Sequence, residues 1–381
     1  MTIELLESLR SPQGSRALEE AALYDDPLKA VTTLRKSFPP ELASAAVEMA
    51  FLRRKAVGRF PHANHMFFTR DAFEQASSYA VSAWRARRYR EFSRVSDWCC
   101  GIGADSLALA EVTRIEGLDT DELRVAIAQA NAEALGLEEQ ASFRIANCLA
   151  EPPTAGAVWA DPSRRPGGLR VTHPDRYEPS LRALRERADS VPIGVKCSPA
   201  IAHGDIPPDA EAEFISLNGE LKETVLWFGA LKTADRRASI LPEGLSMVPG
   251  EGRAPVRPPG GYLLDPDPAV ARAGCVDTLA QELDAWRIDS TISYLSSDIP
   301  IHTPWAQTLT VLDCVPFNLK RIKALIRERG WHAEEVRKRG VTLDVDATRK
   351  ALKNEGGAPV ILVVTRLGGK TWVLIAERRI D

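Results

Sequence analysis

Two glycines set between acidic residues form the first motif of this sequence that could bind a reactive ligand. The segment from Val95 to Asp105 reads Val-Ser-Asp-Trp-Cys-Cys-Gly-Ile-Gly-Ala-Asp and leads from a short apolar run into good helix formers. Gly101 and Gly103 allow a backbone turn to adopt φ > 0 and to pass close to a ligand, because glycine carries no Cβ. We therefore predict a strand, a tight turn and a helix that bind a nucleotide-like ligand.

The charged residues around this turn indicate which ligand fits. Ser106 stands where the dinucleotide fingerprint requires Gly or Ala, and Asp105 brings a carboxylate to a helix N-terminus that would otherwise hold pyrophosphate. A carboxylate there could instead attract the ammonium group of an amino-acid-bearing ligand. Asp119 ends the next apolar run, as expected of an acid that accepts hydrogen bonds from two ribose hydroxyls. These residues disfavour an NAD(P)-dependent enzyme.

A second chemical motif follows the apolar run from Ala157 to Ala160. It reads Asp161-Pro-Ser-Arg-Arg-Pro-Gly-Gly168, and its carboxylate would lie at the carboxyl edge of a parallel sheet, where such sheets bind ligands. Pro162 restricts the exit of the loop, and the guanidinium groups of Arg164 and Arg165 suit an anionic substrate. We expect Asp161, Pro162 and Arg164 to take part in catalysis.

The two motifs together resemble those of class I S-adenosylmethionine-dependent methyltransferases, in a variant that begins Asp-x-Cys-Cys-Gly-x-Gly at Asp97. The resemblance implies an α/β fold with a Rossmann-like sheet, and S-adenosyl-L-methionine as the cofactor. It also implies which residues bind the cofactor. These are Asp97, Cys99, Gly101, Gly103, Asp105, Asp119, Asn147, Thr69 and Gln75.

Two of these cofactor residues have a competing interpretation. The stretch from Met66 to Gln75 is similar to a Gln-bearing segment that closes over the cofactor in several RNA methyltransferases. Thr69, however, is also a suitable N-cap for a helix that begins near Arg70. Asn147 follows the apolar run from Ala141 to Ile145, and it could meet the adenine amine or bind its own backbone.

The Asp161 loop resembles the Asp/Asn-Pro-Pro-x motif of base-modifying methyltransferases, except that Arg164 replaces the aromatic residue that stacks on the target base. Arg164 could stack in its place or bind phosphate. The resemblance implies methylation of structured RNA, tRNA or rRNA, by direct transfer to a base nitrogen. The alternative from another class is a catalytically silent protein that binds cofactor and RNA.

A cysteine offers a third possibility. The order Asp-Pro-x-Arg and then x-Cys-x-Pro is similar to the uridine 5-methyltransferases, whose Cys attacks C6 of the pyrimidine. Cys197 would need a lowered pKa, and Lys196 precedes it, but neighbours on a strand point to opposite faces. Cys197 can also be a small buried side chain, which is the interpretation we favour.

The elements that must position these motifs divide the chain into three parts. Residues 1–92 carry apolar residues at helical spacing with prolines between the helices, and are predicted to form a helical domain. Residues 93–250 are the predicted Rossmann-like domain, in which 220–228 could be strand or helix. A Pro/Gly-rich stretch, 248–261, is the best boundary. Residues 260–381 resemble the THUMP-like α/β domain that follows such methyltransferases.

Within this last part we expect two helices and two buried strands. The helices are predicted over 267–282 and 319–329. The strands are predicted over 359–365 and 371–376, around a turn at Gly368 and Gly369.

Composition limits the remaining possibilities. The 381 residues carry a formal net charge of −3, and the six cysteines are scattered without a Cys-x-x-Cys pair. We expect a cytoplasmic protein with reduced thiols. No apolar run approaches the length of about 18 residues that a membrane helix needs. His62 and His65 have no further ligand at suitable spacing, so we expect no metal site.

Two local surpluses of basic residues predict where RNA binds. From Arg53 to Arg94 ten Lys and Arg residues outnumber three acidic ones, and from Lys320 to Arg339 eight outnumber three. The second group is predicted to form a basic helix and a turn. Such clusters contact the RNA backbone, and the competing interpretation is a solvated charged face.

Overall fold

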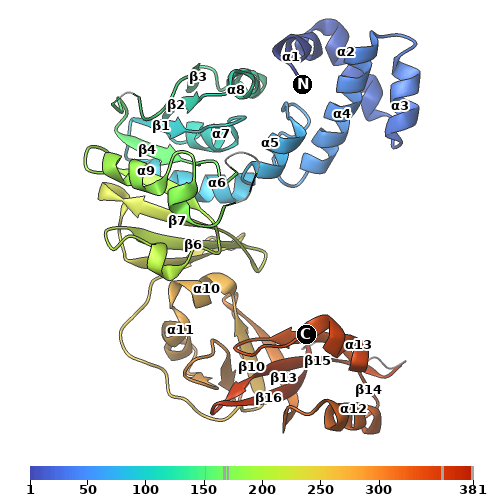
Figure 1. Cartoon of the computed structure of the whole chain (residues 1–381), viewed down its shortest axis with the longest axis vertical. Helices are drawn as coiled ribbons and strands as arrows, with labels where there is room; N and C mark the ends of the chain where they lie inside the picture. The colour runs from blue at the N-terminus through green and yellow to red at the C-terminus, as the bar shows by residue number, and fades with distance from the viewer. Residues whose placement is uncertain (151, 166–168, 170, 353–355, 379–381) are drawn as a thin grey trace. The chain divides into compact units, whose positions relative to one another are not determined.

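The computed structural model describes residues 1–150, 152–165, 169, 171–352 and 356–378 (Figure 1). The chain forms two compact units, of which the first comprises Met1–Ala212 and Glu223–Asp235 and the second Glu213–Lys222 and Arg236–Asp381. This division does not coincide with the predicted boundaries at 92 and 250–260. The N-terminal helices belong to the same unit as the Rossmann-like sheet because they pack on its helices. The three-domain division stays a prediction.

The first unit begins with helices, as predicted. Proline starts α2, α3 and α4, where its missing N–H costs no hydrogen bond. The helices are α1 (Ile3–Arg10), α2 (Pro12–Ala22), α3 (Pro27–Leu34), α4 (Pro40–Ala56), α5 (Arg70–Gln75) and α6 (Tyr79–Ala86), followed by the 3-10 turn η1 (Arg87–Tyr89). Helix α6 packs against α7, and α1 reaches α8.

The sheet of this unit has the strand order β3-β2-β1-β4-β5-β7. The first five strands are parallel, and β7 runs antiparallel to β5. The strands are β1 (Arg94–Trp98), β2 (Arg114–Asp119), β3 (Ala141–Ile145), β4 (Ala157–Ala160), β5 (Ile193–Cys197) and β7 (Glu220–Phe228). The helices are α7 (Ala104–Ala110), α8 (Glu122–Ala134) and α9 (Leu181–Arg187), with 3-10 turns η3 (Pro174–Arg176), η4 (His203–Asp205) and η5 (Gly229–Leu231).

This order fixes where a ligand can bind. Strands β2 and β3, which follow β1 in the chain, lie on one side of it in the sheet. Strands β4 and β5, which come next, lie on its other side. The carboxyl ends of β1 and β4 therefore flank the point where the strand order reverses, and the crevice there is the usual ligand site of such sheets. The segment 220–228, for which the sequence allowed strand or helix, is strand β7.

The second unit contains a seven-stranded sheet of order β11-β12-β10-β13-β16-β15-β14. Its strands are β10 (Tyr262–Pro266), β11 (Trp286–Arg287), β12 (Leu295–Ser297), β13 (Ala306–Pro316), β14 (Trp331–Lys338), β15 (Ala358–Leu367) and β16 (Lys370–Arg378). The other elements are β6 (Glu211–Leu217), which begins at the end of the first unit, β8 (Arg236–Leu241), β9 (Leu245–Met247), α10 (Pro268–Ala273), α11 (Val276–Glu282), α12 (Leu319–Glu328) and α13 (Val345–Leu352).

The predicted hairpin of two buried strands is confirmed as β15 and β16, which are longer than expected. Residues of β15 alternate between two apolar clusters, Leu362 and Val364 on one face and Ile361 and Val363 on the other, so both faces of the sheet are buried. The helix predicted over 267–282 is two helices, because Gly274 ends α10 in a left-handed conformation with φ 80°.

One prediction in this unit is wrong. The basic residues at 337 and 338 lie on strand β14 and not in a turn. Separately, none of the helices in the described ranges is both long enough and apolar enough to cross a membrane.

Candidate active site

A cleft of about 390 Å³ opens at the carboxyl ends of β1 and β4. Six acidic and four basic residues are among those that line it. Most of the predicted site residues contribute to its wall, namely Gln75, Asp97, Cys99, Gly101, Asp105, Asp119, Asp161, Pro162 and Arg164. The topology thus brings the two sequence motifs together.

The turn between β1 and α7 has the left-handed backbone that its glycines allow. Gly101 has φ +57° and Gly103 φ +81°, while Cys99 adopts φ 63° without being glycine. A Cβ added to Gly101 would meet nothing within 4 Å, so the space beside it is open to a ligand. A Cβ at Gly103 would lie 3.2 Å from Ala128 Cβ. Gly103 therefore shapes the turn and is absent from the described lining of the cleft.

Asp119 ends β2 and holds its carboxylate in one orientation. Its Oδ2 accepts a hydrogen bond from the Gly101 N–H at 2.9 Å, and its Oδ1 accepts one from the Asp121 N–H at 3.0 Å. The carboxylate is thereby fixed at the cleft wall, next to the open side of the glycine turn.

Asp97 carries an unsatisfied oxygen. Its Oδ2 accepts a hydrogen bond from the Ser106 hydroxyl, but its Oδ1 is buried and has no partner among the described residues. Burial, followed by the nearby Asp105 carboxylate, raises the pKa of Asp97 well above its usual range. Buried polar atoms are nearly always hydrogen-bonded, so an unpaired one in a cleft wall fits a donor supplied by a ligand.

Asp105, in contrast, is fully engaged. It pairs with Arg85 at 2.8 Å, accepts the Trp159 indole N–H at 3.0 Å and accepts the Ser82 hydroxyl. Burial alone would raise the pKa of Asp105. The positive charges of Arg85 and then Lys196 lower it by more than burial raises it, so the net pKa lies below the ordinary value. This geometry gives Asp105 a role in holding α6 and leaves it less suited than Asp97 to bind an ammonium group.

Arg85 is the centre of a buried charge network. It is 3% exposed, its Nε lies 2.9 Å from Glu223 Oε1, and its guanidinium stacks 4.1 Å from the ring centroid of Trp159. Burial lowers the pKa of Arg85, but the Asp105 and Glu223 carboxylates raise it by more, so the net pKa lies above its usual range. Burial raises the pKa of Glu223 despite this partner.

Asp161 is held by a buried lysine. Lys196 Nζ donates to Asp161 Oδ2 at 2.7 Å, and Lys196 is only 5% exposed. Its strand neighbour Cys197 is fully buried and is not among the described residues that line the cleft. Burial raises the pKa of the Cys197 thiol. As expected for neighbours on a strand, only Lys196 reaches the site.

Arg164 presents a second unsatisfied group to the cleft. Its Nη1 is buried without a hydrogen-bond partner among the described residues. The loop is fixed by a pair of backbone hydrogen bonds between Ser163 and Glu178, of 2.8 and 3.0 Å. The end of the predicted motif, 166–168, lies outside the described residues. An anionic or carbonyl-bearing group would satisfy this guanidinium.

Two predicted cofactor residues adopt the competing arrangement. Thr69 is the N-cap of α5 and accepts from the Ala72 N–H at 3.2 Å. Asn147 is exposed, and its Oδ1 accepts from the Leu149 N–H at 3.0 Å. Neither belongs to the described lining of the cleft, because each side chain binds its own backbone.

A buried amide connects the glycine turn to the N-terminal segment. Asn131 of α8 accepts the Phe67 N–H at 2.6 Å through Oδ1. Its Nδ2 donates to Phe67 O at 3.2 Å and to Ile102 O at 3.0 Å. One side chain therefore holds both the segment that follows α4 and the glycine turn beside the cleft.

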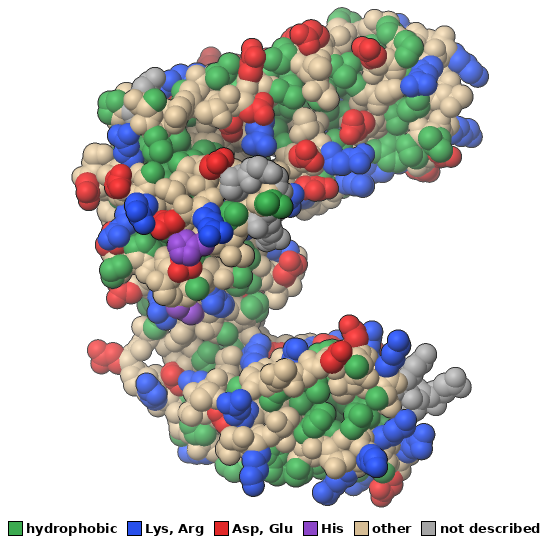
Figure 2. Space-filling model, viewed as in Figure 1, with side chains coloured by type: hydrophobic (Ala, Val, Ile, Leu, Met, Phe, Trp, Pro, Cys, Tyr) green, Lys and Arg blue, Asp and Glu red, His purple; other side chains and the backbone are tan. Residues whose placement is uncertain are grey.

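Most of the basic residues predicted to bind RNA in the first unit already make hydrogen bonds within the protein. Six of the ten basic residues donate to carbonyl or carboxylate oxygens, namely Arg53, Arg54, Arg59, Arg85, Arg88 and Arg94. In the second unit Arg337 pairs with Glu335 and Asp265, and Arg339 pairs with Asp265. The exposed cations of α12 are different, and Figure 2 shows Lys and Arg gathered at the lower right, where α12 lies in Figure 1.

Sequence reasoning missed the importance of Arg85, Ser82 and Glu223, whose partners lie far apart in the chain. Lys196 carried a usable signal. A lysine inside an apolar strand is rarely buried without an acidic partner, and its position at the end of β5 pointed to the acid that ends β4.

The fold and the cleft define a class of protein, namely an α/β protein whose Rossmann-like sheet has a cleft beside a glycine turn at the carboxyl ends of its central strands. An uncharacterised S-adenosylmethionine-dependent methyltransferase of Mycobacterium tuberculosis, known from two strains, is 35% identical over 336 residues, which span 84% of this chain and 92% of the relative. The chain belongs to this family of S-adenosylmethionine-dependent methyltransferases. The predicted family and cofactor, S-adenosyl-L-methionine, are confirmed.

Further similarities concern the two ends of the chain and its overall fold. Residues 306–378 match the THUMP domain-like family, and residues 2–56 match a domain of unknown function. A crystal structure described as that of a methyltransferase from Porphyromonas gingivalis W83 has a TM-score of 0.77 at 19% identity and covers 96% of this chain and 98% of its own. The predicted α/β fold, with N-terminal helices and a C-terminal THUMP-like part, is confirmed.

Proposed function

We propose that the protein transfers a methyl group from S-adenosyl-L-methionine to a base nitrogen of structured RNA, tRNA or rRNA. The observation that carries this proposal is the Asp161 carboxylate, held by Lys196 beside the unsatisfied Arg164 guanidinium in the cofactor cleft. The THUMP-like match and the exposed basic face of α12 support RNA as the substrate.

Three residues are best suited to hold the cofactor. Asp119 can accept from the ribose hydroxyls, Gly101 leaves space for the cofactor beside the turn, and Asp97 Oδ1 can accept from the ammonium. The excess of acidic over basic residues in the wall favours a ligand with a net positive charge. The bound cofactor supplies an electrophilic methyl group on a sulfonium.

The remaining residues would position the acceptor base. Lys196 engages Asp161 Oδ2, so Oδ1 can accept a hydrogen bond from the base. Arg164 can bind a phosphate or the plane of the base, and Pro162 restricts the loop between them. Direct transfer depends on this alignment because the protein forms no bond to the substrate.

Two alternatives have less support. A pyrimidine C5-methyltransferase would need Cys197 as a nucleophile, but its thiol is fully buried and has a raised pKa. A catalytically silent protein would not need a buried lysine to hold Asp161 in the cleft.

Replacing Asp119 with alanine should weaken binding of S-adenosylmethionine by about 1.5 to 3 kcal/mol, the range for hydrogen bonds to a charged group. Isothermal titration calorimetry with the cofactor or its demethylated product measures this, and NAD should give no heat. Asp121→Asn is the matched control, because Asp121 is exposed, caps α8 and is not among the described cleft residues. Unchanged affinity in Asp119→Ala, or tight NAD binding, contradicts the assignment.

Affinity for tRNA or rRNA fragments should fall steeply as salt rises. The triple variant Lys320→Gln, Arg321→Gln and Arg327→Gln on α12 should reduce the slope of log affinity against log salt by about 0.9 for each phosphate that these side chains neutralise in the wild type. A filter-binding series at several salt concentrations measures the slope.

The control for this experiment removes the same charge elsewhere. Lys29, Arg35 and Lys36 are exposed on or next to α3, and their replacement by Gln should leave the slope nearly unchanged. Residues 337 and 339 are unsuitable because their ion pairs hold the second unit together. Absence of RNA binding even at low salt would mean that the α12 charges are only a solvated face.

A further inference from the structure

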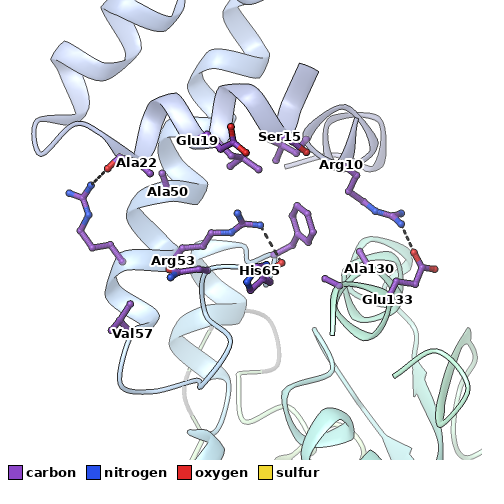
Figure 3. A pocket seen from close by; sticks show the side chains of 16 residues that line it. Arg10, Ser15, Glu19, Ala22, Ala50, Arg53, Val57, His65, Ala130 and Glu133 are labelled. Carbon is purple, nitrogen blue, oxygen red and sulfur yellow. Dashed lines mark hydrogen bonds and ion pairs between the residues drawn. The ribbon is translucent and has the colours of Figure 1, made fainter. Parts of the chain in front are cut away.

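A second cavity, of about 810 Å³, lies among the N-terminal helices of the first unit (Figure 3). Its wall comes from α1, α2, α4, the segment after α4, and α8. It has no described lining residue in common with the cofactor cleft. Its volume is within the range of about 300 to 1,000 Å³ typical of ligand pockets.

The wall contains a half-buried cation without a counter-ion. Arg53 Nε donates to Met66 O at 2.8 Å, and its Nη2 donates to His65 O at 3.3 Å. Both acceptors are neutral carbonyls, and Arg53 forms no ion pair within the described ranges. The guanidinium also stacks 5.0 Å from the centroid of the Phe67 ring, which holds it in place.

Two other arginines of this unit are neutralised by carboxylates, whereas Arg59, like Arg53, donates to a backbone carbonyl and its pKa is lowered by burial. Arg85 pairs with Asp105 and Glu223, and Arg88 pairs with Glu211 at 2.6 Å. A charge removed from water is costly unless an opposite charge compensates it. Burial lowers the pKa of Arg53 to about 10, as expected of an uncompensated cation. Arg53 is thus complementary to an anion that enters the cavity.

The rest of the wall suits a nucleotide. Figure 3 shows Arg53 beside His65, with Ser15 and Glu19 across the cavity and Glu133 on α8. Asn64 and His65 are exposed polar groups that can bind base edges, while other lining residues are apolar and can contact the face of a base. At the end of α4 the exposed Lys55 extends the positive charge beyond the cavity, whereas Arg54 pairs with Asp25 at 3.2 Å.

We propose that this cavity binds one phosphate-bearing nucleotide of the RNA substrate, with Arg53 as the phosphate ligand. The inference rests on the proposed function, because it identifies where a second part of the same RNA would be held. The cofactor cleft would receive the target base, and the cavity would receive an unpaired nucleotide elsewhere in the RNA.

Two variants of the full-length protein test this site. Arg53→Met removes the charge and keeps an unbranched side chain over Phe67, whereas Ser15→Trp fills the cavity from an exposed position without changing any charge. Lys29→Met on α3 is the control, since it removes an exposed charge that is not among the described lining residues. Thermal unfolding and cofactor titration verify that each variant is folded.

The measurement is binding of fluorescently labelled tRNA over a salt series, with unlabelled 5′-AMP as a competitor. Arg53→Met and Ser15→Trp should each bind about tenfold more weakly, and Arg53→Met should reduce the salt slope by about 0.7, the value for one neutralised phosphate of a single strand. Lys29→Met should stay within about twofold of the wild type, as expected for an exposed residue that makes no contact.

The outcomes separate this inference from the proposed function. If the wild type binds tRNA and both cavity variants bind equally well, the cavity site is wrong while the proposed function stands. If 5′-AMP binds the wild type in an Arg53-dependent manner without displacing tRNA, the cavity belongs to a free nucleotide and the inference is likewise overturned. If the wild type fails to bind RNA, the proposed function and this inference both fail.

Discussion

The Asp161→Asn variant is expected to lose methyl transfer by about 10²- to 10⁴-fold, the usual effect of removing a positioned acid or base, while its cofactor affinity changes little. Asparagine replaces one carboxylate oxygen with an NH2 group and cannot form the ion pair with Lys196, so one oxygen can no longer bind Lys196 while the other accepts from the base. Transfer of labelled methyl groups to RNA from a strain that lacks the protein measures turnover, and calorimetry measures cofactor binding.

The matching control is Cys197→Ala, which should keep turnover within about threefold because the thiol is fully buried with a raised pKa. The opposite pattern would contradict direct transfer. An active Asp161→Asn, an inactive Cys197→Ala and a covalent adduct on 5-fluoropyrimidine RNA would together establish Cys197 as a nucleophile.

The Arg85→Met variant is expected to lower the free energy of unfolding by about 3 to 5 kcal/mol, the cost of breaking a buried ion pair by removing one partner. Asp105 and Glu223 would both stay buried without their cation. Urea unfolding followed by circular dichroism measures the change. Arg94→Met removes an exposed pair with Glu116 and should cost less than about 1 kcal/mol. Equal decreases in the two variants would contradict a structural role specific to Arg85.

The glycine turn and the carboxylate beside it could be predicted because backbone geometry demands particular residue types there. The positive φ of Gly101 and Gly103 favours glycine, and Asp119 must end β2 for its carboxylate to face the turn. These requirements act within a few residues or within one strand pair, so they leave a pattern in the sequence.

The charge network behind the cleft leaves no such pattern. Arg85 meets Glu223 across 138 positions of the chain, and nothing local distinguishes Arg85 from the other basic residues near it. Short-range competition explains two other differences. Thr69 and Asn147 find backbone N–H groups two or three residues away, and such partners are available before any cofactor binds.

In the second unit, the degree to which a strand is buried decides whether it can be recognised from the apolar residues in its sequence. Strands β15 and β16 are apolar on both faces, and their continuous apolar runs make them recognisable in the sequence. In strand β14, Trp331 and Ala333 alternate toward the core, but a register shift between Ala333 and Glu335 interrupts the alternation before Val336. The charges that suggested a turn are therefore charges of a strand.

The amide of Asn131 couples the segment after α4 to the glycine turn in a thermodynamic sense. Because this one side chain bonds both Phe67 and Ile102, local unfolding of the segment after α4 removes a restraint from the glycine turn. A cofactor that orders the turn must, by the same linkage, suppress opening of that segment. The stability of the segment after α4 and the order of the glycine turn are therefore coupled through this one side chain.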